Sequence, residues 1–465
     1  MNRVNRIGLR AIFALAIFAV LAVAILTRPQ KTLTEFDQPQ YFTVASDVMH
    51  YGVFSNGWFA DNEPAGAPKP GMFYGPLYPW MIVALAKADP RFATAVDCGA
   101  DMWRGKKPYG SCEVYLWPML LIHALLLTLG ALAVARAAEL LFGGERFFWV
   151  TGVVAAAALT AEANQFSFVM TEATTFALYS LTMLAMVLGW TRANPRYFLL
   201  AGLGLGLLCL TRFSFLVVAP VLAVLIAIDA RFVARPRRGW AATGVFAFIL
   251  AFLAVILPWA ARNAVSVGKF GLTEEYGAHA LVERFAYDQM TPREFALAFP
   301  YCLPEVGPRI VSAMFGPQAM VRFDYESKGS FYDIGSIKRF ELIAQHKRLD
   351  PIIGQLFREE LRENGWRYIL VSIPLGWCGM WVGGWLALLL VPMFAVACVA
   401  AWRRSQPLLL LYALPALAML ALHTALANFY TRYNLVLIGP FSVATAWLIV
   451  SAGARVLSRP QAPAP

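Results

Sequence analysis

Residues 5–27 read NRIGLRAIFALAIFAVLAVAILT, a basic start followed by an unbroken apolar run. The run from Leu9 to Leu26 approaches the roughly 20 residues that a helix needs to cross a bilayer. A cleaved signal peptide has the same layout, and Ala22-Val23-Ala24 resembles a cleavage site. We favour a retained first span because of the length of the run. Both interpretations place residue 28 outside the cytoplasm.

The composition of the whole chain is also that of a membrane protein. Of its 465 residues, 59% are hydrophobic and 14% are charged, with a mean hydropathy of +0.58, too little polar surface to cover a water-soluble globule. Further apolar runs lie at about 115–141, 147–161, 168–190, 197–211, 213–230, 241–258, 369–401, 407–427 and 434–453. We therefore expect one membrane-embedded, all-α domain over residues 1–465, a polytopic helical bundle of about ten spans.

The arginines indicate how these spans are oriented. With alternating sides, the basic clusters fall where the chain begins: Arg3, Arg6, Arg10, Arg146, Arg192, Arg196, the cluster at 231–238, Arg403, Arg404, Arg455 and Arg459. Because cytoplasmic loops are enriched in lysine and arginine, we expect both termini to be cytoplasmic in a multi-pass protein of the inner cell membrane. The net charge of +11 is then a result of topology and not a sign of nucleic-acid binding. Residues 28–114 and 259–368 become two long extracytoplasmic loops.

Each long loop carries a stretch that is expected to lie at the membrane surface. YGPLYPWMIVALAKA (74–88) is apolar but too short to span the bilayer. DPIIGQLFREELRENGWRYIL (350–370) predicts an amphipathic helix that leads into the apolar run at 369–401. Cys98 and Cys112 flank a polar loop, so a disulfide between them is expected, with Cys302 as an alternative partner.

Nucleotide-dependent and zinc-dependent functions have no support in the sequence. GLGLGLLCLTR (202–212) has alternating glycines but follows no strand, so close packing of helices explains it better than nucleotide binding. The chain has no P-loop, CxxC or HExxH motif. An ABC-type pump and a structural zinc site are therefore disfavoured.

Acidic residues near the outer ends of the spans are the first candidates for chemistry. Asp37 is either a hydrated anchor or a general base facing a membrane-level cavity. Asp47 is expected on the wet face of a helix that starts near Pro39. Glu162 and Glu172 lie between the third and fourth spans, where an acid is costly unless it lines a polar cavity.

Arginines at the same outer ends break the positive-inside pattern. Arg262 lies in LPWAARN (257–263), Arg432 lies between two tyrosines at 430–433, and Arg212 is a weaker third case. Snorkelling to lipid headgroups accounts for such residues. A guanidinium group at this level is also suited to gripping phosphate with two parallel hydrogen bonds.

Five fragments, taken in order, resemble the GT-C class of integral membrane glycosyltransferases. The similarity is to bacterial relatives of dolichyl-phosphate-mannose protein mannosyltransferases and of the aminoarabinose transferases that act on lipid A. The fragments are FDQPQYFTVASDVMHYGVFSNG (36–57), GPLYP (75–79), MTEATTF (170–176), LPWAARNAVSVGKF (257–270) and TRYNLVLIGP (431–440).

The resemblance implies a membrane glycosyltransferase that moves a hexosyl or pentosyl group from a polyprenyl-phosphate donor, with inversion. By position, Asp37 would be the general base, Arg262 and Arg432 would contact the donor phosphate, and Glu172 would be a second-site acid. Gln38 stands where many relatives have a second acid, so no cofactor is assigned and the use of a divalent metal stays open.

Aromatic and amide side chains complete the expected site. The candidates for a substrate platform are Tyr41, Tyr78, Asn263 and Tyr433, with Tyr51, Trp58 and Tyr74 as further stacking surfaces. Interfacial belts of membrane proteins use the same aromatic residues.

Two other functions are compatible with this architecture. A transporter or flippase of lipid-linked intermediates would place ionisable groups at the bilayer midplane, whereas the candidates here cluster at one face. A polysaccharide polymerase or ligase would share the fold and differ in its acceptor. For the favoured enzyme, the expected partners are the donor lipid, an extracytoplasmic lipid, glycan or protein acceptor, and the bilayer, with no nucleic acid.

Overall fold

The structure is a computed structural model that describes residues 3–28, 32–57, 68–232, 240–427 and 430–457. Every regular element in these ranges is helical and none is a strand, which confirms the all-α expectation. Capping residues in the sequence mark the N-terminal ends of several helices. Asp89 precedes Pro90 and accepts hydrogen bonds from the amides of Arg91 and Phe92, and Thr291 forms a capping box with Glu294.

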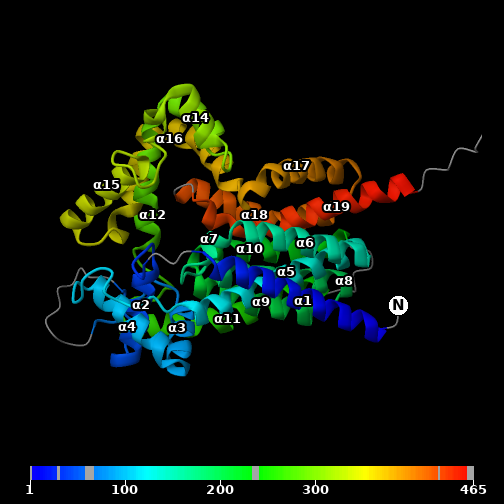
Figure 1. Cartoon of the computed structure of the whole chain (residues 1–465), viewed down its shortest axis with the longest axis horizontal. Coiled ribbons are helices and arrows are strands. Elements are labelled where there is room, and N and C mark those ends of the chain that lie inside the picture. The colour runs from blue at the N-terminus through cyan, green and yellow to red at the C-terminus, as the bar shows by residue number, and fades with distance from the viewer. Residues whose placement is uncertain (1–2, 29–31, 58–67, 233–239, 428–429, 458–465) are drawn as a thin grey trace, which may run out of the picture.

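Most of the longer helices run side by side along the long axis of the molecule (Figure 1). They are α1 (Arg3–Leu26), α5 (Trp117–Phe142), α6 (Glu145–Ala161), α8 (Glu172–Arg192), α9 (Pro195–Thr211), α10 (Val218–Phe232), α11 (Trp240–Ser266), α17 (Ala387–Arg403), α18 (Pro407–Leu426) and α19 (Ile438–Leu457). A 3-10 turn, η1 (Phe213–Val217), precedes α10, and another, η5 (Thr431–Leu437), precedes α19. These elements form the bundle that the apolar runs predict.

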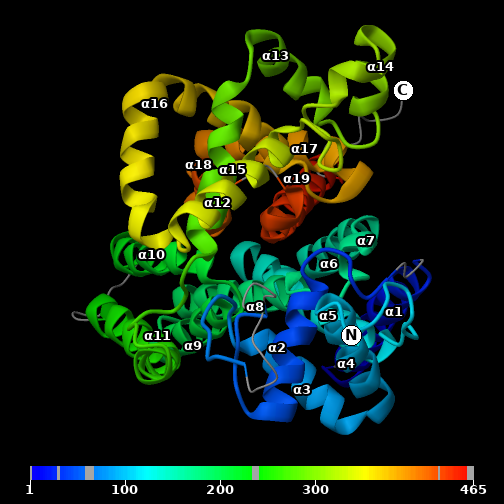
Figure 2. The ribbon, with the colours of Figure 1, turned by 90° about the vertical axis from the view of Figure 1, so that its left-hand side faces the viewer.

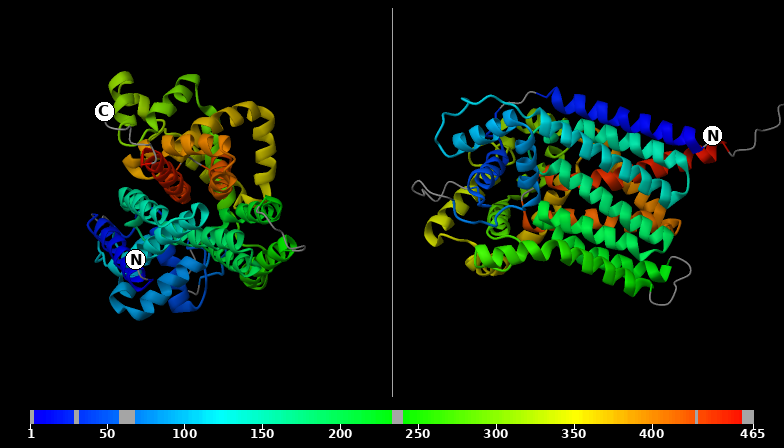
Figure 3. Two further views of the ribbon diagram at one scale, coloured as in Figure 1. Left: turned by 90° about the vertical axis from the view of Figure 1, so that its right-hand side faces the viewer. Right: turned by 90° about the horizontal axis from the view of Figure 1, so that it is seen from below.

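The two long loops gather at one end of this bundle (Figure 2). The first loop supplies α2 (Gln38–Tyr51), α3 (Leu77–Ala88) and α4 (Pro90–Trp103), and the short α7 (Ala163–Phe166) lies at the same end. The second loop supplies α12 (Tyr276–Phe285), α13 (Pro292–Tyr301), α14 (Gly307–Phe315), α15 (Phe331–His346) and α16 (Asp350–Met380). The start of α1 and the end of α19 lie at the opposite end (Figure 3), as expected if both loops share one side of the membrane.

Seven helices among the described residues are long and apolar enough to cross a bilayer. The segments are Arg6–Leu26, Trp117–Phe142, Glu172–Arg192, Ala241–Ser266, Gly384–Arg403, Pro407–Leu426 and Thr431–Ala452. The predicted spans at 147–161, 197–211 and 213–230 correspond to the shorter helices α6, α9 and α10, which lie in the same bundle. The count of about ten spans stays a prediction.

Close packing of α9 on α11 explains the alternating glycines. A Cβ on Gly202 would lie 2.2 Å from the backbone oxygen of Phe248, and one on Gly206 would lie 2.6 Å from Cβ of Val255. Only glycine permits these approaches between the two backbones. The helix-packing interpretation of this motif is thus confirmed.

The apolar run at 369–401, whose length and Pro392 leave room for a kink or an added interfacial segment, is divided between two helices. Helix α16 continues from Asp350 to Met380 at the loop end, and α17 begins only at Ala387. Between them, the amides of Gly383 and Gly384 each donate a 2.8 Å hydrogen bond to Oε1 of Glu162, and both glycines have positive φ. Glu162 therefore fixes the backbone between the two helices.

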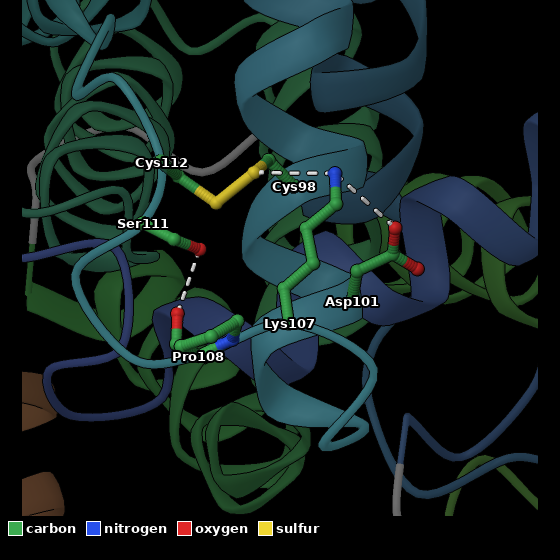
Figure 4. The surroundings of a disulfide bond; sticks show 6 residues. All are labelled: Cys98, Asp101, Lys107, Pro108, Ser111 and Cys112. Carbon is green, nitrogen blue, oxygen red and sulfur yellow. Dashed lines mark hydrogen bonds and ion pairs between the residues drawn. A yellow bond between two sulfur atoms is a disulfide. The ribbon is translucent and has the colours of Figure 1, made fainter.

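Two disulfides hold the loops. Cys98 and Cys112 are bonded with Cα atoms 5.9 Å apart, as expected, and Lys107 between them pairs with Asp101 (Figure 4). Cys302 does not serve as their alternative partner, because it is bonded to Cys378 with Cα atoms 5.0 Å apart. The extension of α16 brings Cys378 into the loop layer, which the sequence placed in a membrane span.

Removal of the Cys302–Cys378 bond is expected to destabilise the protein more than removal of the Cys98–Cys112 bond. The first closes a sequence separation of 76 residues and the second a separation of 14, and the entropy removed from the unfolded chain grows with loop length within a typical 2 to about 4 kcal/mol. Melting temperatures of the two double alanine variants in one detergent test this order. A larger loss for the Cys98/Cys112 variant would contradict it.

Candidate active site

An ion pair joins the first loop to the start of the last bundle helix. Nη2 of Arg432 lies 3.4 Å from Oδ2 of Asp37, although 395 residues separate them in the chain. Asp37 precedes α2, and Arg432 lies in the 3-10 turn η5. The Asp37 side chain is 37% exposed and that of Arg432 is 10% exposed. The carboxylate of Asp37 is thus exposed to solvent, whereas the guanidinium of Arg432 is largely buried.

Aromatic rings and a sulfur atom enclose the Arg432 guanidinium. Its central carbon lies 5.5 Å from the ring centre of Phe36 and 5.3 Å from those of Tyr430 and Tyr433. Nη1 lies 3.5 Å from Sδ of Met170. Nε has no hydrogen-bonding partner in the described part of the chain. The guanidinium therefore keeps donors available for an incoming anion.

A second ion pair lies beside the first. Nη2 of Arg212 is 3.2 Å from Oε1 of Glu172, and both side chains are largely buried. The Arg212 guanidinium lies 5.2 Å from the ring centre of Tyr433, the same ring that Arg432 contacts. Two cations therefore share one tyrosine, and the two carboxylates of these pairs come from the first loop and from the start of α8. Arg212, the weaker third case among the arginines in the sequence, thus lies beside the Asp37–Arg432 pair.

The second loop contributes a third acid that the sequence did not single out. Glu283 of α12 is buried and bonded to Arg339 of α15 at 2.5 Å. Burial raises the pKa of Glu283 to about 7, Arg339 opposes the rise, and Asp37 adds to it. Glu283 is therefore within electrostatic range of Asp37.

The predicted platform tyrosines have different environments. The ring of Tyr41 lies 5.0 Å from that of Tyr74 and 5.2 Å from that of Tyr78. Burial raises the pKa of Tyr41, and the charge of Asp37 adds to the rise. The hydroxyl of Tyr78 pairs with Nε2 of His123 at 3.0 Å in the interior, so Tyr78 supports Tyr41 from below.

The remaining aromatic candidates differ in their positions. Tyr433 is part of the site through its contacts with the two arginines, whereas Tyr51 is exposed at the last residue of α2. Trp58 lies outside the described residues.

Arg262 is not brought to the Asp37–Arg432 pair. Its Nη1 donates to the carbonyl of Gly71 at 2.6 Å and its Nη2 to the carbonyl of Phe54 at 3.0 Å, above the ring of Trp259. Asn263 is buried, accepts a bond from Arg262 and donates to the carbonyl of Gly271 at 2.8 Å. Both side chains donate to loop carbonyls, so their contacts here are structural.

Two polar residues of α2 also hold the first loop in place. Asp47 is buried and accepts bonds from Ser55 and Arg104, so its assignment to the wet face of the helix is wrong. Gln38 is buried next to Asp37, and its Oε1 accepts the amide of Val169 at 2.8 Å. These bonds fix the backbone that presents Asp37.

Metal ligands are scarce in this site. Across the described residues, no three His, Cys, Asp or Glu side chains come together so as to hold a metal ion. Gln38, which occupies the position next to the proposed base, is already bonded to the backbone and offers no carboxylate. The use of a divalent metal stays an open prediction.

Comparison with known proteins gives one similar solved structure to report. No protein-family model matches the sequence, and no curated protein matches it. The chain is similar to the structure titled "Crystal Structure of ArnT from Cupriavidus metallidurans bound to Undecaprenyl phosphate", with 14% identity and a TM-score of 0.47. The match covers 97% of this chain and 63% of that chain, so this chain spans less than two thirds of the length of that protein. The description of the site rests on its own residues: two carboxylate–guanidinium pairs that meet at one tyrosine, at one end of an all-α bundle of membrane type.

Proposed function

We propose that this protein is a membrane glycosyltransferase that takes a sugar from a polyprenyl-phosphate donor at the extracytoplasmic face of the membrane. The observation that carries the proposal is the exposed Asp37 carboxylate paired with the enclosed Arg432 guanidinium, with Arg212 and Glu172 beside them. A proton acceptor and two cations are what such a transfer needs. Their position at the end of the bundle lets a lipid tail remain in the bilayer while the sugar reaches water.

In the proposed reaction, Asp37 takes the proton from the acceptor hydroxyl as its oxygen attacks the anomeric carbon of the donor. The bond from that carbon to the phosphate oxygen breaks, and the electron pair leaves with the lipid phosphate, so the anomeric configuration is inverted. Arg432 and Arg212 hold the charge that develops on the phosphate. Glu172 positions Arg212, and Tyr41 and Tyr433 border the sugar.

The direct test is turnover with a panel of labelled polyprenyl-phosphate sugars and an envelope extract as acceptor source. The proposal expects a new glycosidic bond of inverted configuration and one released polyprenyl phosphate for each bond formed. Movement of the lipid between the leaflets of a vesicle without a new bond would instead support a flippase, and a growing saccharide chain would support a polymerase.

The three arginines should differ in their effect on the binding of polyprenyl phosphate. Arg432→Gln and Arg212→Gln are each expected to weaken binding by about 1.5 to 3 kcal/mol, roughly ten- to a hundredfold, because each removes a charge-assisted hydrogen bond. Arg262→Gln is expected to lower the melting temperature and leave the affinity of the folded protein unchanged, since Arg262 bonds to Gly71 and Phe54. Photo-crosslinking with a polyprenyl-phosphate probe measures all three. An affinity loss confined to Arg262→Gln would show that the original assignment of Arg262 is correct.

A further inference from the structure

Helix α14 of the second loop exposes a stripe of apolar side chains. Val306, Ile310 and Met314 are spaced by four residues, which places them on one face of the helix, and each is at least 39% exposed. The adjacent face, with Gly307 and Val311, is buried. A contiguous apolar stripe on an otherwise polar loop marks a surface that contacts a membrane or another protein.

The buried face of α14 holds the helix firmly on the rest of the second loop. A Cβ on Gly307 would lie 2.3 Å from the carbonyl oxygens of Pro300 and Tyr301, so the start of α14 packs directly on the end of α13. Val311 belongs to the same apolar core as Phe331, the first residue of α15. The direction in which the stripe faces is therefore fixed by packing.

Two contacts hold α13 and α14 at the end of α16. The disulfide between Cys302 and Cys378 lies just before α14 in the chain. The indole Nε1 of Trp377 donates to the carbonyl of Phe299 at 2.9 Å, and the two rings lie 5.9 Å apart. The level of α14 relative to the membrane is thus set by the end of α16.

The end of α16 lies where the chain enters the membrane. The candidate span Gly384–Arg403 begins six residues after Cys378, and Trp385 near its start is 62% exposed. Tryptophans concentrate at the level of the lipid headgroups. In Figure 2, which views the loop end of the bundle, α13 and α14 extend past α17 to one side. Helix α14 therefore lies over the lipid that borders α17.

The charges around the stripe also fit a lipid surface. The guanidinium of Arg293 lies 5.9 Å from the ring centre of Phe315 at the end of α14, and Arg309 is exposed on the helix itself. Arginines beside an apolar helix face reach the headgroups while their stems stay on apolar atoms. Lipid phosphates attract such cations.

We propose that α14 is an interfacial anchor whose partner is the headgroup layer of the leaflet at the loop end of the bundle. Helices of this kind bury their apolar face by roughly 5 to 10 Å at the boundary of headgroups and acyl chains. Phe331 and Arg339 both lie on α15, and Arg339 pairs with Glu283. By fixing α15 through the shared core, the anchor holds this pair at the level of the membrane surface.

Photolabelling with a phenyl diazirine dissolved in the bilayer tests the anchor in the full-length protein in lipid nanodiscs. We expect mass spectrometry to find Ile310 and Met314 labelled several-fold more than Phe340. Phe340 is the matched control, since it is apolar and 56% exposed but belongs to α15, which lies farther from the bundle than α14 (Figure 1). The measurement needs no turnover, so its failure is distinguishable from failure of the proposed enzyme.

The double variant Ile310→Glu/Met314→Glu tests whether the stripe causes the labelling. Charges on the stripe should lower the labelling of Phe315 several-fold, whereas Ile337→Glu, at an exposed apolar position of α15, should leave it unchanged. Labelling of Phe315 that the double variant does not alter would overturn the proposal.

The wild-type comparison decides by itself if the double variant does not fold. Labelling of Met314 no higher than that of Phe340 would overturn the proposal. If native mass spectrometry then shows a dimer, the stripe is covered by a second copy of the chain and not by lipid.

Discussion

Replacement of Asp37 with asparagine is expected to lower sugar transfer by about 10² to 10⁴-fold, which corresponds to roughly 3 to 5 kcal/mol of transition-state stabilisation. Asparagine has nearly the same shape as aspartate but cannot take a proton from the acceptor hydroxyl. The loss should therefore fall on kcat, with the binding of polyprenyl phosphate retained. Initial rates over a range of donor concentrations measure both quantities.

Asp97→Asn is the matched control for this variant. Asp97 lies on α4 of the same loop, where it accepts a 2.7 Å bond from Ser46 and pairs with His50, away from the two arginines. Its replacement should leave kcat unchanged. Asp37→Asn with near wild-type kcat and an unchanged melting temperature would exclude Asp37 as the base.

Replacement of Arg284 with methionine is expected to cost about 3 to 5 kcal/mol of stability, because it leaves a buried carboxylate without its cation. Arg284 is fully buried, pairs with Asp288 at 2.9 Å, and donates to Tyr368, Ser372 and the carbonyl of Thr424. One guanidinium thus ties α12 to α16 and α18. Thermal unfolding in detergent should show the loss.

The pH dependence of this loss follows from Asp288. Burial raises the pKa of Asp288 to about 6, and Arg284 opposes the rise. Without Arg284 the pKa should rise further. A carboxyl whose pKa is raised by folding contributes most stability below its unfolded pKa of about 4 and loses it as pH rises through the folded value. Arg284→Met should therefore be less damaging at about pH 5 than at about pH 8.

Two further variants test whether the uncompensated charge causes the loss of stability. Arg284→Met/Asp288→Asn should recover part of the stability, because the uncompensated charge is gone. Arg358→Met, at an exposed position of α16, should change stability by about 0.5 kcal/mol or less. If the double variant is no more stable than Arg284→Met, the loss comes from the bonds to Tyr368, Ser372 and Thr424 and not from the charge.

Most of the fold could be predicted because the length of an apolar run and the residues that cap a helix are local features of the sequence. The runs of the bundle and the helix from Asp350 were visible in the sequence, whereas the pairing of Cys98 with Cys112 stood beside Cys302 as an alternative. The length of the run at 369–401 allowed a kink or an added segment, but composition cannot tell a span from an apolar helix that packs in a loop layer. Only the bonds of Glu162 to Gly383 and Gly384 locate the break.

The candidate site was predictable in part. Asp37 and Arg432 were found because each is an ionisable residue at the outer end of a span, and the structure joins them. Arg262 is also an ionisable residue at the end of a predicted span, yet its guanidinium donates to the carbonyls of Gly71 and Phe54. Nothing in the sequence around Glu283 marks it, since its significance comes from Arg339 and Asp37 across the fold.

The sequence by itself determined that this chain is a helical membrane protein and that certain ionisable residues lie at the ends of its helices. Hydropathy and helical periodicity belong to short stretches, so no distant part of the chain is needed to recognise them. Only the tertiary structure decided which of those residues meet. A guanidinium can pair with a carboxylate, a carbonyl or a ring, and the choice between Asp37 for Arg432 and loop carbonyls for Arg262 depends on segments that pack together from far apart in the chain.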